Sequence, residues 1–271
     1  MDLTVMAVHA HPDDEVLGTG GALARYAAEG VRTVLVTCTD GRQGDGPNGV
    51  KPGEAGHDGD QVALLRESEL DTSAKALGIA HVERLGYHDS GMDGWDTNHH
   101  PEAFANVAVA VAAERLAELV RHYQPQVVIT YDANGGYGHP DHIQAHRITH
   151  AATAATGIPR KLYHSVLRRS VMDELAAYVV EGNEDTDGED ISEDDDMGVT
   201  DEEVTALLDV TDHVPAKRTA LEAHASQGDS AFLLGLPESL QHRLFAEEAY
   251  QLQSSTVPTP DREDDLLTGL R

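Results

Sequence analysis

The chain has only one cysteine, Cys38, among its 271 residues and no apolar stretch long enough to cross a membrane. A lone cysteine excludes an intramolecular disulfide, and its place in the apolar run 31–39 predicts a buried thiol. A membrane helix needs about 20 predominantly apolar residues. The first residues also lack the basic and apolar regions of a signal peptide. These absences predict a cytoplasmic protein with no membrane partner.

Basic residues are scarce as well. Lys and Arg number 19 against 48 Asp and Glu, which gives a formal net charge of −29. Proteins that bind nucleic acids or anionic membrane surfaces use basic patches to neutralise phosphate. We therefore expect neither partner, and the charge itself mainly supports solubility. Hydrophobic residues still make up 40% of the chain, which is enough for the core of one sizeable domain.

The N-terminal apolar run is followed by residue types that bind metals. Residues 3–10 predict a buried parallel strand, and residues 16–29 have the apolar spacing of a helix. His11 and Asp14 stand three positions apart in the turn between them, and an imidazole with a carboxylate is a common ligand pair for zinc. The alternative is structural, with Asp13 capping the helix and Asp14 and Glu15 favouring its positive end.

The same order of features recurs further along the chain. An apolar strand over residues 127–131 leads into a Gly-rich loop, after which His139 and His142 open a second helix. Pro140 suits the first turn of that helix because its missing N–H has no partner there. Capping would have to explain two such turns, so we interpret the two as one site.

Two further histidines on the second helix stay outside the predicted metal site. His146 and His150 continue the four-residue spacing that begins at His142. A stripe of histidines along one helix face explains this spacing as well as metal binding does.

The alternation of strands and helices predicts the fold. Its βαβαβαβ rhythm indicates an α/β doubly wound (Rossmann-like), mostly parallel sheet with helices on both faces. In such sheets ligands bind outside the carboxyl ends of the strands, where both motifs lie. No G-x-G-x-x-G follows the first strand, which argues against nucleotide binding. We expect residues 1–271 to form a single domain.

Several segments depart from this rhythm. The Gly/Asp-rich loop 40–60 starts at the carboxyl end of a strand and predicts a substrate lid, with functionless disorder as the alternative. Residues 102–123 predict one long helix, and residues 233–252 a mixed, partly helical region. Residues 181–203 contain 13 acids and no Lys or Arg, which predicts a disordered insertion. Calcium binding at 194–196 is the alternative there.

At these motifs the chain resembles a known family. AHPDDE from Ala10 and GHPDH from Gly138 resemble the paired motifs of the PIG-L/LmbE-like zinc-dependent N-deacetylases. Within that family, YDANGGYGHPDH at 131–142 is similar to the branch that handles mycothiol and its precursor. Gly138 stands where the amidase members of that branch often have proline.

The rest of the chain bears on the branch within the family. ALEAHASQ at 220–227, with the segments 243–248 and 257–270, is most similar to the mycothiol S-conjugate amidases. By contrast, the segment VLGTGG after Glu15 is similar to the general family sequence. The mycothiol enzymes usually carry polar residues at these positions. Both amidase and deacetylase activities therefore stay open.

The motifs predict one zinc ion per chain, held by His11, Asp14 and His142, with ferrous iron as the alternative metal. Three protein ligands and one open position are typical of catalytic zinc, which lowers the pKa of a water to about 7. Asp13 is adjacent to these ligands without being one of them. It is therefore predicted to take the proton of the attacking water as general base.

The resemblance implies further roles. His139 and Tyr137 would stabilise charge on the amide oxygen, and His139 would also pass a proton to the departing amine. Asp141 would orient His139. Arg66 would face the substrate, and Asp89 would bind its hydroxyls. The structural alternatives are orientation alone for His139, loop packing for Tyr137, a surface ion pair for Arg66 and a turn for Asp89.

The predicted function is hydrolysis of an amide bond on a small amino sugar. It would either release glucosaminyl-inositol from a cysteine conjugate or deacetylate N-acetylglucosaminyl-inositol. The alternatives are a secondary-metabolite N-deacylase, a phosphoester hydrolase and a catalytically silent zinc-binding protein. The intact Asp13 argues against a silent protein. Ligands for one metal, rather than two about 3.5–4 Å apart, argue against a phosphoester hydrolase. A homo-oligomer stays open.

Overall fold

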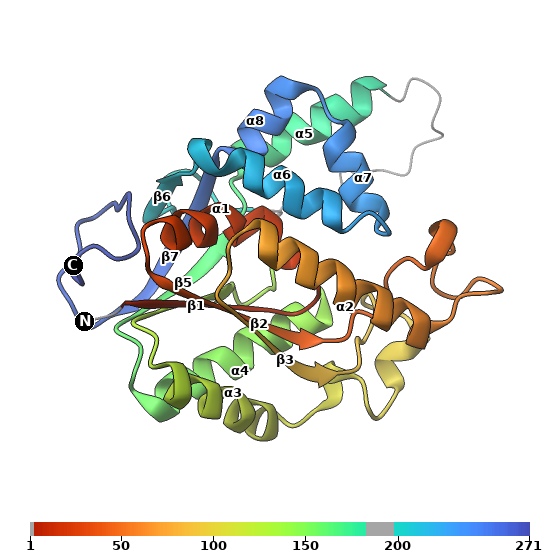
Figure 1. The fold of residues 1–271 in the computed structure, drawn as a ribbon, viewed down its shortest axis with the longest axis horizontal. Coiled ribbons are helices and arrows are strands. Elements are labelled where there is room, and N and C mark those ends of the chain that lie inside the picture. Colours follow the sequence, from red (N-terminus) through yellow and green to blue (C-terminus); the bar gives the residue numbers. More distant parts are fainter. Residues whose placement is uncertain (1–2, 183–197) are drawn as a thin grey trace.

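Seven strands form one sheet in the order β3-β2-β1-β4-β5-β7-β6 (Figure 1). The structure is a computed structural model that describes residues 3–182 and 198–271. The strands are β1 (Thr4–His9), β2 (Arg32–Thr39), β3 (His81–Tyr87), β4 (Val127–Tyr131), β5 (Lys161–Val166), β6 (Ala206–Asp209) and β7 (Glu247–Ser255). All neighbouring pairs are parallel except those made by β7, which runs antiparallel to β5 and β6.

Helices cover both faces of this sheet. Those of eight residues or more are α1 (Asp14–Ala28), α2 (Gly59–Ala76), α3 (Val109–Tyr123), α4 (Pro140–Thr156), α5 (Arg169–Gly182), α6 (Val214–Ala223), α7 (Gly228–Gly235) and α8 (Glu238–Phe245). Helices α3 and α4 cover one face, α1 and α2 the other, and α5–α8 pack outside α1 and α2 (Figure 1). The predicted doubly wound, mostly parallel architecture is confirmed.

Strand alternation explains the two cores. In β1, Met6 and Val8 face α3 and α4, whereas Val5 and Ala7 face α1. All four side chains are fully buried, as expected for a central parallel strand covered on both faces. Cys38 of β2 is buried too, as predicted. None of the helices in the described ranges is long and apolar enough to cross a membrane.

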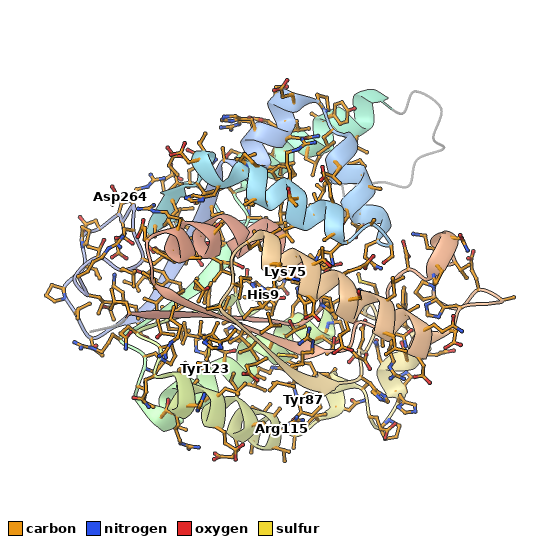
Figure 2. The ribbon with its side chains drawn as sticks, viewed as in Figure 1. His9, Lys75, Tyr87, Arg115, Tyr123 and Asp264 are labelled. Atoms are coloured by element: carbon orange, nitrogen blue, oxygen red, sulfur yellow. The ribbon has the colours of Figure 1, made fainter. Side chains whose placement is uncertain are left out.

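The predicted helix 102–123 starts later than expected. The helix α3 begins at Val109, and a short 3-10 turn, Phe104–Asn106, precedes it. The Phe104 ring stacks on Tyr87 at the end of β3, with centroids 5.1 Å apart. Arg115 of α3 also lies over the Tyr87 ring, 4.8 Å from its centroid (Figure 2). Residues before Val109 therefore stay outside α3, because Phe104 packs against the end of β3 instead of continuing the helix that local propensity favours.

The region 233–252 is only partly helical, and its last part is the strand β7, which the sequence did not predict. The segment EEAYQLQ has no β-branched residue, so its local propensity for a strand is low. Ala249 and Tyr250 are nevertheless buried, and β7 is paired on both sides by β5 and β6. Tertiary pairing therefore overrides local preference at this position.

Of the acidic segment 181–203, the structure describes residues 181–182 and 198–203. The predicted disorder and the calcium alternative at 194–196 fall on residues outside the described ranges. The loop 40–60 includes the 3-10 turn Pro47–Gly49, and its role as a lid stays a prediction.

The C-terminal segment is anchored by a buried charge. Lys161 Nζ lies 2.5 Å from Glu263 Oε1, and the Tyr163 hydroxyl donates to Glu263 Oε2 at 2.5 Å. The Lys161 and Glu263 side chains are 0% and 1% exposed. Leu266 and Leu267 follow and are fully buried against the core.

Replacing Glu263 with alanine should destabilise the fold strongly, because the Lys161 ammonium would stay buried without a counter-charge. We expect a loss of about 3–5 kcal/mol in the free energy of unfolding, measured by urea denaturation. The control is Arg121→Ala, which removes an exposed ion pair with Glu114 and should leave the urea midpoint near wild type. Equal stability of the two variants would contradict this anchor.

Candidate metal centre and active site

The two sequence motifs meet at one edge of the sheet. Strands β1 and β4 are parallel neighbours, with Val5 opposite Val127 and Ala7 opposite Ile129. Their carboxyl ends therefore lie side by side, one followed by His11 and the other by the loop into α4. This is the edge at which α/β sheets bind ligands.

Three predicted ligands form a compact triangle. His11 Nδ1 lies 3.3 Å from Asp14 Oδ2 and 3.3 Å from His142 Nε2, and His142 Nε2 lies 3.4 Å from the other carboxylate oxygen, Asp14 Oδ1. Zinc with ligands at about 2.0–2.1 Å in a tetrahedral shell requires donor atoms roughly 3.3–3.4 Å apart. The structure thus brings together His11, Asp14 and His142 as a His/Asp group that fits a single divalent metal.

The hydrogen bonds of both imidazoles leave the right nitrogens free. His142 Nδ1 lies 3.0 Å from the Gly135 carbonyl, which can only accept, so Nε2 keeps its lone pair. His11 Nε2 lies 3.2 Å from Asp141 Oδ2, which leaves Nδ1 facing the triangle. Metal-binding histidines usually hold their second nitrogen in this way.

Tyr131 fixes the third ligand. Its hydroxyl donates to Asp14 Oδ2 at 2.7 Å and accepts from the Ala10 backbone N–H at 2.9 Å. His9, labelled in Figure 2, lies inside the protein with Nδ1 3.2 Å from the same hydroxyl. Asp14 Oδ2 also accepts from the His11 backbone N–H at 2.7 Å.

Charge around the triangle favours a cation. Burial alone would lower the pKa of His11, but Asp89, Asp14 and Asp141 outweigh it and raise that pKa well above its usual value. Burial alone would raise the pKa of Asp14, yet His142 and His11 hold it well below its usual range. The carboxylates therefore attract positive charge to the position that the triangle surrounds.

Asp13 lies beside the triangle and does not cap the helix. It precedes α1 with φ of 100°, and its side chain makes no capping hydrogen bond. This excludes the structural alternative for Asp13. Burial raises the pKa of Asp13 to about 6, with Arg66 acting in the opposite direction. A carboxylate with that pKa can accept a proton near neutral pH.

Arg66 holds Asp13 in place. Its guanidinium lies 2.8 Å from Asp13 Oδ2 and donates to the Pro12 and Gly41 carbonyls at 2.5 and 2.7 Å. The side chain is 5% exposed, so it is not part of a surface ion pair. Arg66 lines the cavity beside Asp13, which is compatible with the predicted contact with the substrate. That contact stays a prediction.

The predicted partner of Asp141 is wrong. Its carboxylate accepts from His11 Nε2 and from the Ser90 backbone N–H at 2.8 Å, and the Ser90 hydroxyl also donates to it. Only the Asp141 backbone N–H contacts His139, donating to Nδ1 at 3.1 Å. Asp141 follows Pro140 in the first turn of α4, where its side chain reaches across to the β1 motif rather than back to His139.

Asp89 belongs to the same network. Its Oδ1 lies 3.4 Å from His11 Nε2 and accepts from the Gly91 backbone N–H at 2.8 Å, and Oδ2 accepts from that of Gln43. Burial would raise the pKa of Asp89, but His11 and these hydrogen bonds hold it well below its usual range. Asp89 also lines the cavity, which is compatible with the predicted binding of substrate hydroxyls. That role stays a prediction.

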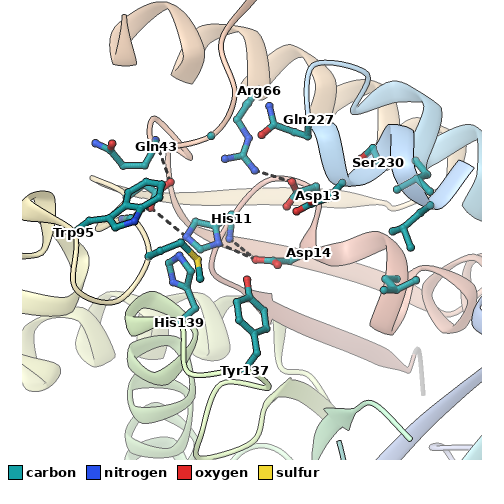
Figure 3. Close-up of a pocket in the computed structure, with 18 residues that line it drawn as sticks. His11, Asp13, Asp14, Gln43, Arg66, Trp95, Tyr137, His139, Gln227 and Ser230 are labelled. Carbon is teal, nitrogen blue, oxygen red and sulfur yellow. Dashed lines mark hydrogen bonds and ion pairs between the residues drawn. The ribbon is translucent and has the colours of Figure 1, made fainter. Parts of the chain in front are cut away.

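His139 and Tyr137 approach His11 and Asp14 from the second motif (Figure 3). A His139 nitrogen lies within 4.8 Å of the nitrogens of His11 and His142. Because Nδ1 accepts from the Asp141 N–H, the proton of the neutral ring sits on Nε2. Burial, with the neighbouring histidines, lowers the pKa of His139 to about 3, and burial also raises that of Tyr137. Both groups are hydrogen-bond donors at neutral pH.

The Gly-rich loop before α4 requires its glycines. At Gly135, with φ of 66°, an added Cβ would lie 2.6 Å from His142 Cβ and 2.8 Å from the Ile143 backbone nitrogen. Gly138 has φ of 91°, which proline cannot adopt because its ring fixes φ near −65°. The loop that carries Tyr137 therefore has a backbone conformation that a chain with proline at position 138 could not adopt.

A cavity of about 360 Å³ opens beside the triangle (Figure 3). Its lining combines hydrogen-bonding groups, among them Gln43, Gln227 and Ser230, with the apolar surfaces of Met92 and Trp95. Ligand pockets typically measure roughly 300–1,000 Å³. The cavity thus suits a small polar molecule with at least one apolar face.

Glu15 and His224 form a buried pair behind Asp13 that was not predicted from the sequence. Glu15, for which the sequence indicated only a favourable charge at the helix N-terminus, is fully buried. It accepts hydrogen bonds from the Asp13 backbone N–H at 2.9 Å and from the Ser73 hydroxyl, and it lies 2.8 Å from His224 Nε2. Burial would lower the pKa of His224, but Glu15 outweighs it and raises that pKa. The AHASQ segment that contains His224 was a usable signal.

Comparison with known proteins identifies the family of the chain. Residues 6–153 match the family described as PIG-L: GlcNAc-PI de-N-acetylase. The chain belongs to this family. A 1D-myo-inositol 2-acetamido-2-deoxy-alpha-D-glucopyranoside deacetylase of Acidothermus cellulolyticus is 40% identical, over 98% of this chain and 95% of its own length. The protein of that name from Thermobifida fusca is 38% identical, over 97% and 96%. The chain is thus a PIG-L hydrolase acting on carbon–nitrogen bonds, as the motifs predicted.

Solved structures show the same fold at low identity. The N,N′-diacetylchitobiose deacetylase of Pyrococcus horikoshii gives a TM-score of 0.60 at 18% identity, covering 92% of this chain and 83% of its own. The 4-carboxy-2-hydroxymuconate hydratase GalB of Pseudomonas putida gives 0.63 at 19%, covering 95% and 99%. Because these two activities differ, the fold alone does not decide the reaction of a PIG-L chain.

Replacing Asp141 with asparagine should weaken metal binding by about 10–100-fold, because the His11 ligand would lose its carboxylate partner. The measurement is metal affinity by competition with a chromophoric chelator. The control Asp229→Asn removes the same charge from the cavity wall on α7 and should change affinity little. If both variants lost affinity equally, net charge rather than orientation of His11 would account for the effect.

The charge of Arg66 should set the acidic limb of the pH–rate profile. If Asp13 is the general base, as predicted, kcat/KM should rise as pH increases through a pKa of about 6. Arg66 lowers the Asp13 pKa, and Arg66→Gln should therefore move this limb to higher pH. Arg66→Lys keeps the charge and should leave the limb near its wild-type position. A limb that stays in place in the glutamine variant would show that it reports another group.

Proposed function

We propose that the chain is a metal-dependent deacetylase that removes the acetyl group from N-acetylglucosaminyl-inositol. The observation that carries this proposal is the triangle of His11, Asp14 and His142, with sides of 3.3–3.4 Å, beside the non-ligating Asp13. The names of the relatives from Acidothermus and Thermobifida support the substrate. Zinc is the proposed metal, since two imidazoles and a carboxylate suit it.

A zinc ion at the triangle would act as a Lewis acid on the amide carbonyl and would acidify a water. Asp13 accepts the proton of the attacking water, and Arg66 holds its carboxylate in position 2.8 Å away. The attack converts the amide carbonyl to a tetrahedral centre with negative charge on oxygen. The proton that Asp13 has gained is then available to the departing amine.

His139 and Tyr137 stabilise the charge on the amide oxygen. The His139 Nε2–H and the Tyr137 hydroxyl are the donors, and preorganised donors of this kind are typical of oxyanion sites. The low pKa of His139, about 3, makes it neutral near pH 7. We therefore favour hydrogen-bond donation by His139 over the proton transfer that the resemblance implied.

The cavity supports a sugar–polyol substrate. Trp95 is 38% exposed and offers an apolar surface to a sugar ring, while Arg66, Asp89 and Gln227 offer groups for hydroxyls. The Gly138 conformation, which excludes proline, separates this loop from the amidase pattern. We favour the deacetylase over release of glucosaminyl-inositol from a cysteine conjugate for this reason.

The remaining proposals concern the whole protein. We propose that residues 1–271 form one domain, since a single sheet connects both motifs to the C-terminal segment. We also propose that the enzyme acts in the cytoplasm on its small-molecule substrate. Self-association is an open property that sedimentation of the metal-loaded protein would measure.

Asp13→Asn should lose about 10²–10⁴-fold in turnover while retaining metal, because the amide cannot accept the proton. Asparagine suits this position because it tolerates positive φ better than most residues. His142→Ala should lose both metal and turnover. The measurement is release of free amine from N-acetylglucosaminyl-inositol by the zinc-loaded protein, with metal content determined in parallel.

The same assay distinguishes the alternatives. A mycothiol bimane conjugate should be cleaved much more slowly than the acetylated sugar, and faster cleavage of the conjugate would identify an amidase. Failure to hydrolyse any amide after zinc is restored would indicate a silent metal-binding protein. Normal turnover by the Asp13→Asn variant would show that another group is the base.

A further inference from the structure

A second cluster of histidines lies on α4, outside the cavity. Histidines 142, 146 and 150 stand four residues apart and share one helix face. His142 turns to the catalytic triangle, whereas His146 and His150 meet His164 of β5. One nitrogen of each of the last three rings lies within 4.8 Å of those of the other two.

The geometry of this cluster resembles a ligand set. His150 Nε2 lies 2.9 Å from His164 Nε2, and the ring centroids of His146 lie 4.3 Å from His150 and 5.0 Å from His164. Donor atoms on a tetrahedral zinc lie roughly 3.3–3.4 Å apart. The two Nε2 atoms would therefore need to separate by only a few tenths of an ångström.

His146 has the outer hydrogen bond typical of metal ligands. Its Nδ1 lies 3.0 Å from the Tyr131 backbone carbonyl, which can only accept, so Nε2 is left with its lone pair. His142 is held in the same way at the catalytic triangle, with Nδ1 3.0 Å from the Gly135 carbonyl. The same helix thus repeats one arrangement of imidazole and carbonyl one turn further on.

Two rings of the cluster, His150 and His164, are neutral at neutral pH and can offer a nitrogen to a cation. Burial, with the neighbouring imidazoles, lowers the pKa of His164 to about 3 and also lowers that of His150. No charged imidazolium therefore has to be displaced from His150 or His164. One of their Nε2 atoms carries the proton of the 2.9 Å contact, so binding requires that ring to move its proton to Nδ1. His164 is 5% exposed, whereas His146 and His150 are partly exposed, so an ion can enter from the surface.

We propose that His146, His150 and His164 form a second metal site, which binds a borderline transition metal such as Zn²⁺ through three imidazoles. All-imidazole ligation suits Zn²⁺ and Cu²⁺ rather than Mg²⁺ or Ca²⁺, which prefer oxygen. A bound ion would link α4 to β5, and α4 also carries the catalytic ligand His142. The inference does not depend on which amide the enzyme hydrolyses.

The test is the metal content of the full-length protein after chelator treatment and equilibration with a modest excess of Zn²⁺. The wild type should retain two ions per chain. His150→Ala and His164→Gln should each retain one and keep the catalytic ion, whereas His142→Ala should lose the catalytic ion and retain the other. The double variant of His142 and His150 should retain none.

A matched control addresses the exposed group of His88, His100 and Glu102, whose ligand atoms also lie within 4.8 Å of one another. His100→Ala should leave the two-ion stoichiometry unchanged. In the His142→Ala background, Zn²⁺ should raise the melting temperature, because ligand binding to the folded state stabilises it. The His150 substitution should abolish that rise, and circular dichroism verifies that each variant is folded.

One ion per chain in the wild type would overturn the proposal, as would loss of the second ion in His100→Ala rather than in His150→Ala. If the His150→Ala variant does not fold, His146→Gln is tested in its place, and it should also retain one ion fewer than the wild type. The catalytic deacetylation is measured separately, so its failure would not imitate either result.

Discussion

The site depends on the adjacency of β1 and β4 in the parallel sheet. Neighbouring strands lie about 4.7–4.9 Å apart, so the residues that follow their carboxyl ends can share one ion. His11 and His142 are 131 positions apart in the chain, yet their facing nitrogens are separated by only 3.3 Å. If another strand lay between β1 and β4, the triangle would open by a full strand spacing. Sheet order is therefore a functional constraint, and not only a consequence of packing.

The same adjacency concentrates negative charge. Asp14, Asp89 and Asp141 gather around His11, and the buried Arg66 guanidinium interacts with Asp13, Asp89 and Asp14. Buried carboxylates are costly unless positive charge or hydrogen bonds compensate them. Without a metal, a proton on His11 supplies that compensation, which is the physical reason for its raised pKa. Metal binding would displace this proton, so binding and pH are linked at this site.

The sequence predicted the parts of the site that carry strong local signals. His11, Asp14 and His142 each follow an apolar strand and a turn, so the fold class and the two motifs place them at the same edge. The partners that it missed are set by distant contacts. His224 reaches Glu15 from 209 positions away, and the Asp141 carboxylate turns to His11, 130 positions away, instead of to nearby His139. Strand β7 was missed because its pairing, and not its composition, makes it a strand.

Asp13 has a backbone conformation that metal binding by its neighbours does not explain. Its φ of 100° is unusual for a residue with a side chain, and such a conformation costs about 1–3 kcal/mol. Two contacts maintain this conformation. The Asp13 backbone N–H donates to the Glu15 carboxylate at 2.9 Å, and the Arg66 guanidinium donates to the Asp13 carboxylate at 2.8 Å. A protein that only bound a metal through His11, Asp14 and His142 would gain nothing from this strain. The strained backbone, with the side chain outside both the helix cap and the ligand triangle, is consistent with the general-base role that we propose for Asp13.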